Sequence, residues 1–232
     1  MKEFKHLDDF YDAVDEPSKR EVIDGRRVYV TPAGNVYPSI TSILGWQPKP
    51  GIDEWRKKVG SVEANRIMKE SSELGTMVHD LCEQYLYNIP LNHEYSDEAV
   101  SVFNRLRFIL GNVDNIYGLE LPLYSDMLKV AGTADCVAEY NGVLSVIDFK
   151  TSRRAKKENW ITDYYIQAFF YAVAFYEMSG ALPEQIVILV AVRDNFEIQV
   201  FKKPMSEMDF YISKLLEIMK KQPTVTQQFS EN

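Results

Sequence analysis

The chain has 232 residues, of which 46% are hydrophobic and 26% are charged, and its formal net charge is −8. A chain of this length and composition is expected to form one globular domain, or a core with a smaller N-terminal lobe. The charge argues against a protein that coats DNA nonspecifically, because such proteins are basic overall. The sequence has no run of about 18 apolar residues, so no membrane span is predicted.

The cysteines and the N-terminus indicate a cytoplasmic protein. Cys82 and Cys136 are the only two cysteines, so no disulfide framework is expected and a reducing compartment is predicted. Residues 1–10 are too acidic for a mitochondrial transit peptide and lack the apolar core of a signal peptide.

Apolar periodicity and turn residues predict an α/β fold. An acidic segment to about Pro17 precedes a hairpin over residues 21–30, which turns at Asp24-Gly25. The predicted helices span residues 39–46, 52–59, 61–87, 96–112, 160–178 and 206–221, and the predicted strands span 116–124, 130–140, 143–150, 185–193 and 196–201. This order predicts a mixed central sheet flanked by helices. The predicted parts are a hairpin and mainly helical extension at 1–60, a core at 61–222 and a polar tail at 223–232.

Two aspartates meet in the hairpin predicted at the centre of the sheet. Asn141-Gly142 favours a type I′ turn, and the register that follows from it places Asp135 opposite Asp148. Neighbouring carboxylates repel each other, and a metal ion between them would remove that penalty. Asp148 and Lys150 share one face of their strand. We expect both side chains to lie at a solvent-facing edge of the sheet. The alternative is that both carboxylates are merely solvated there.

Two further polar groups lie on predicted helices. His79 lies on the predicted helix 61–87, beside its apolar stripe. This stripe consists of Leu74, Val78, Leu81, Tyr85 and Leu86. A lone helical histidine is ordinarily a core or boundary residue. Gln167 and Tyr171 share a face of the aromatic helix 160–178, where a glutamine needs a hydrogen-bond partner; the alternative is an ordinary core helix with a tolerated glutamine.

Basic and aromatic residues follow the strand that carries Asp148. The basic run consists of Arg153, Arg154, Lys156 and Lys157, and the aromatic residues are Trp160 and Tyr164. Such a run is often a solvated loop, but its place beside the two aspartates makes it the best candidate for phosphate contacts.

Together these motifs resemble the PD-(D/E)xK nuclease superfamily, specifically its RecB-like exonuclease branch. The matching features, in the family's order, are Gly75-x-x-x-His79, Glu120, Gly132-Thr-Ala-Asp135, Asp148-Phe-Lys150-Thr-Ser152 and Gln167-x-x-x-Tyr171. Residues 38–44 and Trp55-Arg56 also look like the N-terminal segment of the mitochondrial genome maintenance exonucleases and their phage or bacterial relatives. Some relatives hold an iron–sulfur cluster with four cysteines, and this chain departs from them, so no such cluster is expected.

The resemblance implies a metal site and a catalytic lysine. His79, Asp135 and Asp148 would ligate one or two Mg²⁺ or Mn²⁺ ions, together with the backbone carbonyl of Phe149. Lys150 would orient or activate the attacking water and stabilise charge on the phosphate.

The resemblance also implies supporting residues around that site. Glu120 would be the additional acidic residue that positions a water at the metal, and Gln167 and Tyr171 would support the site and touch nucleic acid. Ser152, at the end of the motif, is a further candidate contact with nucleic acid.

The implied function is that of a metal-dependent DNA exonuclease, monomeric and acting on single-stranded ends. In the expected channel, the basic run and the aromatic residues after it form one wall, and Trp55 and Arg56 form the other. One alternative is a structure-selective or site-specific endonuclease of the same fold. Another is a non-catalytic nucleic-acid-binding subunit with a degenerate site. The lack of a transit peptide fits a phage or bacterial origin, with the host cytoplasm as compartment.

Overall fold

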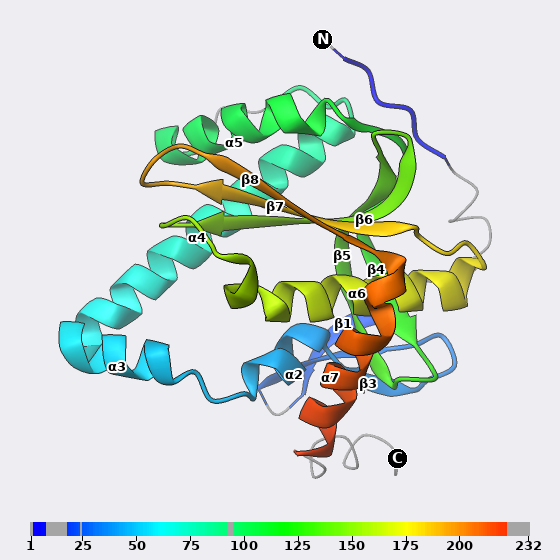
Figure 1. Ribbon diagram of the computed structural model, residues 1–232, viewed down its shortest axis with the longest axis horizontal. Coiled ribbons are helices and arrows are strands. Elements are labelled where there is room, and N and C mark those ends of the chain that lie inside the picture. Colours follow the sequence, from blue (N-terminus) through cyan, green and yellow to red (C-terminus); the bar gives the residue numbers. More distant parts are fainter. Residues whose placement is uncertain (1, 8–17, 24, 92–94, 222–232) are drawn as a thin grey trace.

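A mixed five-stranded sheet forms the centre of the fold (Figure 1). The structure is a computed structural model, which describes residues 2–7, 18–23, 25–91 and 95–221. The strands lie in the order β4 (Val113–Ser125), β5 (Val130–Tyr140), β6 (Val143–Ser152), β7 (Gln185–Val192) and β8 (Ile198–Pro204). β6 and β7 are parallel, and the other neighbours are antiparallel. The central strand is therefore β6.

Helices cover both faces of this sheet, which gives three layers. One face carries α4 (Ser61–Leu86) and α5 (Asp97–Leu110), and the other carries α2 (Ile40–Gly45), α6 (Thr162–Ser179) and α7 (Met208–Lys220). Side chains alternate along β7, so that Ile188 lies in the apolar cluster under α6 and Leu189 in the cluster under α4. The connection from β6 to its parallel neighbour β7 contains the short helix η1 (Glu158–Trp160) and α6. A second short helix, η2 (Met205–Glu207), precedes α7.

A small three-stranded sheet precedes the core. It consists of β1 (Lys19–Ile23), β2 (Arg26–Val30) and β3 (Val36–Pro38). The buried Tyr29 ties it to β5, because its hydroxyl lies 3.0 Å from the Thr133 hydroxyl. After α2, helix α3 (Pro50–Val59) buries no side chain and reaches the N-terminal half of α4. The small sheet is therefore held against the central sheet, whereas α3 is an exposed arm.

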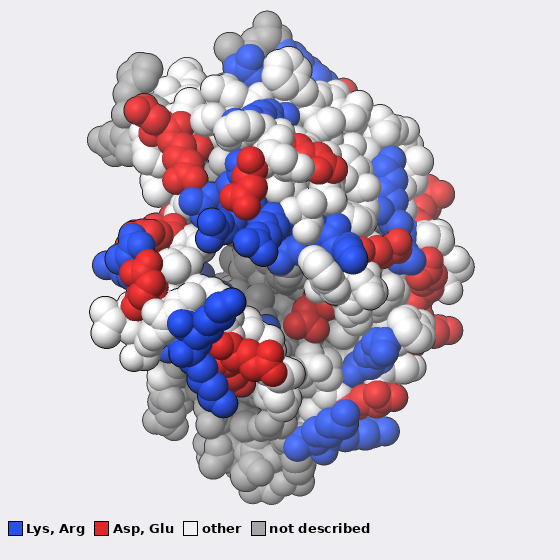
Figure 2. All heavy atoms as spheres, turned by 60° about the vertical axis from the view of Figure 1, so that its left-hand side comes forward, with Lys and Arg blue, Asp and Glu red and all other residues white. Residues whose placement is uncertain are grey.

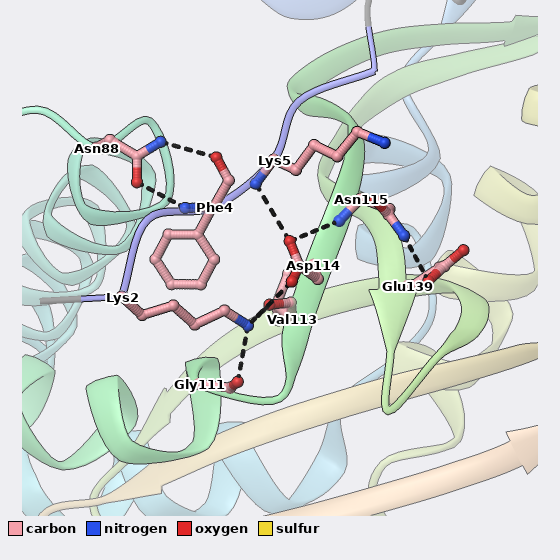
Figure 3. Close-up of polar contacts among 9 residues, drawn as sticks. All are labelled: Lys2, Phe4, Lys5, Asn88, Gly111, Val113, Asp114, Asn115 and Glu139. Atoms are coloured by element: carbon pink, nitrogen blue, oxygen red, sulfur yellow. Dashed lines mark hydrogen bonds and ion pairs between the residues drawn. The ribbon is translucent and has the colours of Figure 1, made fainter.

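Residues 2–7 fasten the end of α4 to the beginning of β4 (Figure 3). The Asn88 side chain accepts a hydrogen bond from the Phe4 backbone N–H at 2.8 Å and donates one to the Phe4 carbonyl at 2.9 Å. The Lys5 N–H donates to Asp114 Oδ1 at 3.1 Å, and the backbone around Lys5 pairs with Ile116. The Phe4 ring packs edge-on against Tyr85, with 5.1 Å between the ring centroids.

The predicted elements and the α/β fold class are confirmed, with shifts of a few residues at the ends of elements. Asn141 and Gly142 have φ angles of 54° and 75°, as a type I′ turn requires, and the predicted register holds from the turn to Cys136 opposite Ile147. β3 was not predicted, because three residues carry too little periodicity. Most of the acidic segment to Pro17, the turn residue Asp24 and the polar tail lie outside the described residues.

One expectation about the central hairpin is wrong. Asp148 does not lie at a solvent-facing edge: β6 is flanked by β5 and β7, and the Asp148 side chain is fully buried. The physical reason is that α6 packs over this end of β6. In the described part of the chain, the helices are too short or too polar to cross a membrane.

Candidate active site

Three carboxylates form a row across β4, β5 and β6. Leu119 pairs with Cys136 and Leu121 with Ala134, so Glu120 lies opposite Asp135. The register of the next pair of strands places Asp148 on the far side of Asp135, one step beyond the last regular pair. Regular pairing ends there because the Phe149 N–H donates to Asp135 Oδ2 at 2.7 Å. The hairpin register thus brings together acids that are distant in the sequence.

The backbone at Glu120 is strained. Its φ is +44°, in the left-handed region that side chains other than glycine rarely adopt. Strain of this kind persists only where the surrounding structure imposes it, and it is common at functional sites. Here it interrupts a regular strand at the residue whose carboxylate reaches the cluster formed with His79 and Asp135.

His79 reaches this row from α4. Its Nδ1 lies 3.5 Å from Asp135 Oδ1, and its ring meets Phe149 edge-on at 6.0 Å. Ligand atoms of His79, Glu120 and Asp135 all lie within 4.8 Å of one another. His79 is therefore neither a core residue nor a plain surface residue, since 27% of its side chain is exposed beside two carboxylates.

The electrostatics of these groups are strongly coupled. Burial would lower the pKa of His79, but the charge of Asp135 raises it to about 9. Burial would likewise raise the pKa of Asp135, but the His79 charge and the hydrogen bond between the two lower it. Glu120 reaches solvent, yet loss of water around it and repulsion by Asp135 raise its pKa to about 7. The Glu120 and Asp135 carboxylates thus lie where a further cation would be stabilised.

Asp148 and Lys150 form a buried ion pair on β6. Lys150 Nζ lies 2.6 Å from both carboxylate oxygens, but only Oδ1 accepts a hydrogen bond of good geometry, and the buried Oδ2 accepts none. Burial raises the pKa of Asp148 to about 6, against the opposing charge of Lys150. Burial would lower the pKa of Lys150, but Asp148 raises it. The ammonium also lies 5.3 Å from the centre of the Tyr164 ring.

The residues present fit a divalent cation. Two carboxylates and one imidazole form a set dominated by oxygen, which suits Mg²⁺ or Mn²⁺. The unused Oδ2 of Asp148 is a further acceptor on the same row. His79, Glu120 and Asp135 form the compact group, whereas Asp148 is directed at Lys150.

Gln167 and Tyr171 are paired with each other on α6. Gln167 Nε2 donates to the Tyr171 hydroxyl at 3.1 Å, and both side chains are buried. A Cβ at Gly132 would lie 2.8 Å from Tyr171 Cε1, so the glycine lets this ring pack against β5. Tyr171 is only 2% exposed, so the expectation that it touches nucleic acid does not fit this arrangement.

The basic run lies on the loop after β6. Arg153 and Arg154 have 70% and 82% of their side chains exposed and share Asp194, at 3.5 and 3.9 Å. Lys157 Nζ lies 5.2 Å from the centre of the exposed Trp160 ring. Figure 2 shows a hollow in one face of the molecule, with Lys and Arg side chains gathered above it and at its lower left.

Two predicted contact residues in this region make hydrogen bonds within the protein, Lys156 through its backbone and Ser152 through its side chain. The Lys156 backbone exchanges two hydrogen bonds with the Gln199 side chain, at 2.7 and 3.1 Å, which fixes the loop. Ser152 is buried and its hydroxyl donates to the Arg154 carbonyl at 2.7 Å. Ser152 thus shapes the turn, and its burial does not fit the expected contact with nucleic acid.

Trp55 and Arg56 lie on α3. Arg56 donates to Asn65 Oδ1 at 2.5 Å and approaches Met68 Sδ at 3.6 Å, which joins α3 to α4. Neither Trp55 nor Arg56 lines the cavity beside His79.

That cavity has a volume of about 530 Å³ and lies between α4 and the small N-terminal sheet. Its lining consists of Arg20, Arg27, Ser72, Gly75, Thr76, His79, Asp80, Glu83 and Glu120. Sequence reasoning missed Arg20 and Arg27, because exposed arginines in a hairpin are common and their approach to α4 depends on long-range packing.

The three-layer fold and the row of acids beside Lys150 fit the resemblance to a nuclease, and similar proteins support that resemblance. No family model matches the chain. The mouse protein named mitochondrial genome maintenance exonuclease 1 is 43% identical over 133 residues, which cover 53% of this chain and 39% of the mouse protein. The human protein of that name is 28% identical over 132 residues, which cover 53% of this chain and 38% of its own. The chain therefore spans less than half the length of these relatives, and they confirm its resemblance to RecB-like PD-(D/E)xK nucleases.

Similar solved structures are more distant. A candidate exonuclease from Eubacterium rectale shares 10% identity, with a TM-score of 0.44 over 80% of this chain and 71% of that chain. SSO0001 shares 13% identity, with a TM-score of 0.38 over 90% of this chain and 82% of that chain. Because both TM-scores are below 0.5, we draw no conclusion from these two structures.

Proposed function

We propose that the chain is a metal-dependent DNA exonuclease that hydrolyses phosphodiester bonds and prefers single-stranded ends. The observation that carries the proposal is the row Glu120–Asp135–Asp148, with His79 beside it and Lys150 paired to its last member. The exonuclease relatives support a nuclease function for the part of the chain they match.

The residues of the row divide the chemistry between them. His79, Glu120 and Asp135 would hold a divalent ion, with Asp148 Oδ2 and the Phe149 carbonyl as further candidate ligands. A bound ion lowers the pKa of water and offsets the charge that develops on the phosphate. Lys150, fixed by Asp148 above the Tyr164 ring, would donate hydrogen bonds to the substrate phosphate and stabilise its negative charge.

The preference for single strands rests on the exposed loop after β6. Basic groups interleaved with aromatic faces grip single strands, because phosphates pair with the cations and bases stack on the rings. Arg153, Arg154 and Lys157 supply the charge, and the exposed Trp160 supplies a ring. The two alternatives are an endonuclease of the same fold and a non-catalytic binding subunit. The second is disfavoured by the presence of every polar group of the row.

The test is digestion of end-labelled linear single strands, linear duplex and circular single strands, with Mg²⁺, Mn²⁺ or EDTA. We expect linear single strands to be shortened from an end with either metal, and not with EDTA or by the Lys150→Ala variant. Cleavage of the circle would favour the endonuclease. Binding without cleavage under every condition would favour the non-catalytic subunit and overturn the proposal.

The chain is further proposed to act as a monomer. Light scattering of the pure protein in solution should then give a single mass near 26.8 kDa; a multiple of this mass would contradict it.

A further inference from the structure

Two arginines of the N-terminal hairpin face the candidate site. Val22 pairs with Arg27 across the hairpin, and Arg20 lies two residues before Val22, so both arginines leave the hairpin on the same side. Both line the cavity that also contains His79 and Glu120. The hairpin therefore presents two cations to the metal-binding group from the side opposite α4.

Among the described residues, these two arginines form no ion pair with the acids of the cavity. Asp80, Glu83 and Glu120 line the same space, yet among the described residues no carboxylate lies within 4.0 Å of either guanidinium. Both arginines are exposed. An arginine that has an acid within the same cavity and does not pair with it keeps all its donors available for a ligand. Its planar fork matches the oxygens of a phosphate.

The cavity also has room for a ligand. Its volume of about 530 Å³ is within the range of roughly 300–1,000 Å³ that ligand sites occupy. Gly75 of α4 lines it, and a Cβ there would meet only Thr151 Oγ1, at an ordinary 3.6 Å. Gly75 therefore has room for a Cβ, and because it lines the cavity, we expect a longer side chain at this position to take up part of the cavity.

We propose that Arg20 and Arg27 bind phosphates of the DNA strand that flank the one to be cleaved, so that the strand runs between the hairpin and α4. This inference rests on the proposed function, because it gives the same site a phosphate-binding wall. It also replaces Trp55 and Arg56 as the wall opposite the loop after β6. The competing explanation is that the arginines only offset the acids of the cavity.

The two explanations differ in the salt dependence of DNA binding. We would measure binding of a fluorescent oligo-dT single strand by anisotropy in EDTA, at several salt concentrations. The variant is Arg20→Gln/Arg27→Gln, and the matched control is Lys19→Gln/Lys220→Gln. The control removes the same charge from the next residue of the hairpin and from the end of α7, both outside the cavity.

We expect the arginine variant to bind more weakly and the negative slope of log K against log salt to become shallower by about 1.4, because each phosphate of a single strand that an arginine neutralises contributes about −0.7 to the slope. The control should keep the wild-type slope. An unchanged slope in the arginine variant, an equal change in the control, or a wild-type protein that does not bind DNA would overturn the inference. Binding by wild type without cleavage would instead overturn only the proposed function, because binding is read without metal.

A second variant, Gly75→Leu, tests the proposal independently in case the arginine variant does not fold. Gly75→Leu places a side chain in the cavity at a helical position where leucine is favoured over glycine. We expect its melting temperature to match or exceed that of wild type while affinity for the single strand falls at least tenfold. Retained affinity in a stable Gly75→Leu protein would show that the strand does not pass through this cavity.

Discussion

The ion pair of Asp148 and Lys150 is almost entirely removed from water. Only 1% of the Asp148 side chain and 18% of the Lys150 side chain are exposed. The burial changes what substitution does, because loss of one partner leaves the other charge in the protein interior. A residue that serves catalysis here also contributes to the stability of the fold.

We expect Asp148→Asn to lower the free energy of unfolding as well as activity. Removing one partner of a buried pair costs about 3–5 kcal/mol, and we expect the lower end because Lys150 is still partly hydrated. The double variant Asp148→Asn/Lys150→Met should be more stable than the single variant, since no unpaired charge remains. Urea unfolding of the two variants and wild type measures this. If the single variant is as stable as wild type, the pair does not have the electrostatic role assigned to it.

His79 separates the active-site interpretation from that of a boundary histidine. We expect His79→Ala to reduce cleavage with Mg²⁺ by at least about 100-fold, because removal of a metal ligand forfeits several kcal/mol of stabilisation of the transition state. His6→Ala is the matched control: His6 stacks on Tyr87 and contacts the Leu86 carbonyl, away from the cavity. Cleavage rates and melting temperatures of both variants are the measurement, and equal activity in the two would return His79 to a structural role.

At the scale of elements, a short hydrogen bond helps to attach β3 to the central sheet. The Tyr37 hydroxyl donates to Asp126, in the connection between β4 and β5, at 2.6 Å. Burial raises the pKa of Tyr37 to about 12, and the hydrogen bond with Asp126 adds to the shift. The small sheet carries Arg20 and Arg27, so this contact holds the hairpin near the site.

The Tyr37 contact predicts a loss of stability at high pH. A tyrosine with a higher pKa in the folded than in the unfolded state contributes stability that is fully present below about pH 10. That contribution is lost as the pH rises towards 12. Tyr37→Phe should therefore be less stable than wild type at pH 8, and the difference should shrink as the pH rises above 10. Urea unfolding from pH 8 to 11 tests this, with the exposed Tyr176→Phe as control. A difference that stays constant with pH would exclude the titration of Tyr37 as its cause.

At the scale of the whole molecule, the sequence predicts the parts of the site that one hairpin and one helix determine. The Asn141-Gly142 turn fixes the register that brings Asp135 towards Asp148, and local periodicity suffices to find it. The burial of Asp148 could not be predicted, because it depends on α6 returning across the end of β6.

The approach of Arg20 and Arg27 to the cavity also could not be predicted from the sequence. Arg20 and Arg27 are more than 50 residues from His79 in the sequence, and long-range packing brings them near it, including that of β2 on β5 through Tyr29. The predicted boundaries at residues 60 and 222 stay predictions. The first falls at Gly60, which has a φ of 87° between α3 and α4.

The most direct test of the proposed active site is anomalous diffraction from crystals of the protein soaked in Mn²⁺. A strong anomalous peak among His79, Glu120 and Asp135 is the predicted result, with His79 no longer paired to Asp135. A peak only at other sites, with the His79–Asp135 contact retained at saturating Mn²⁺, would contradict the assignment of these residues as the metal centre of a nuclease.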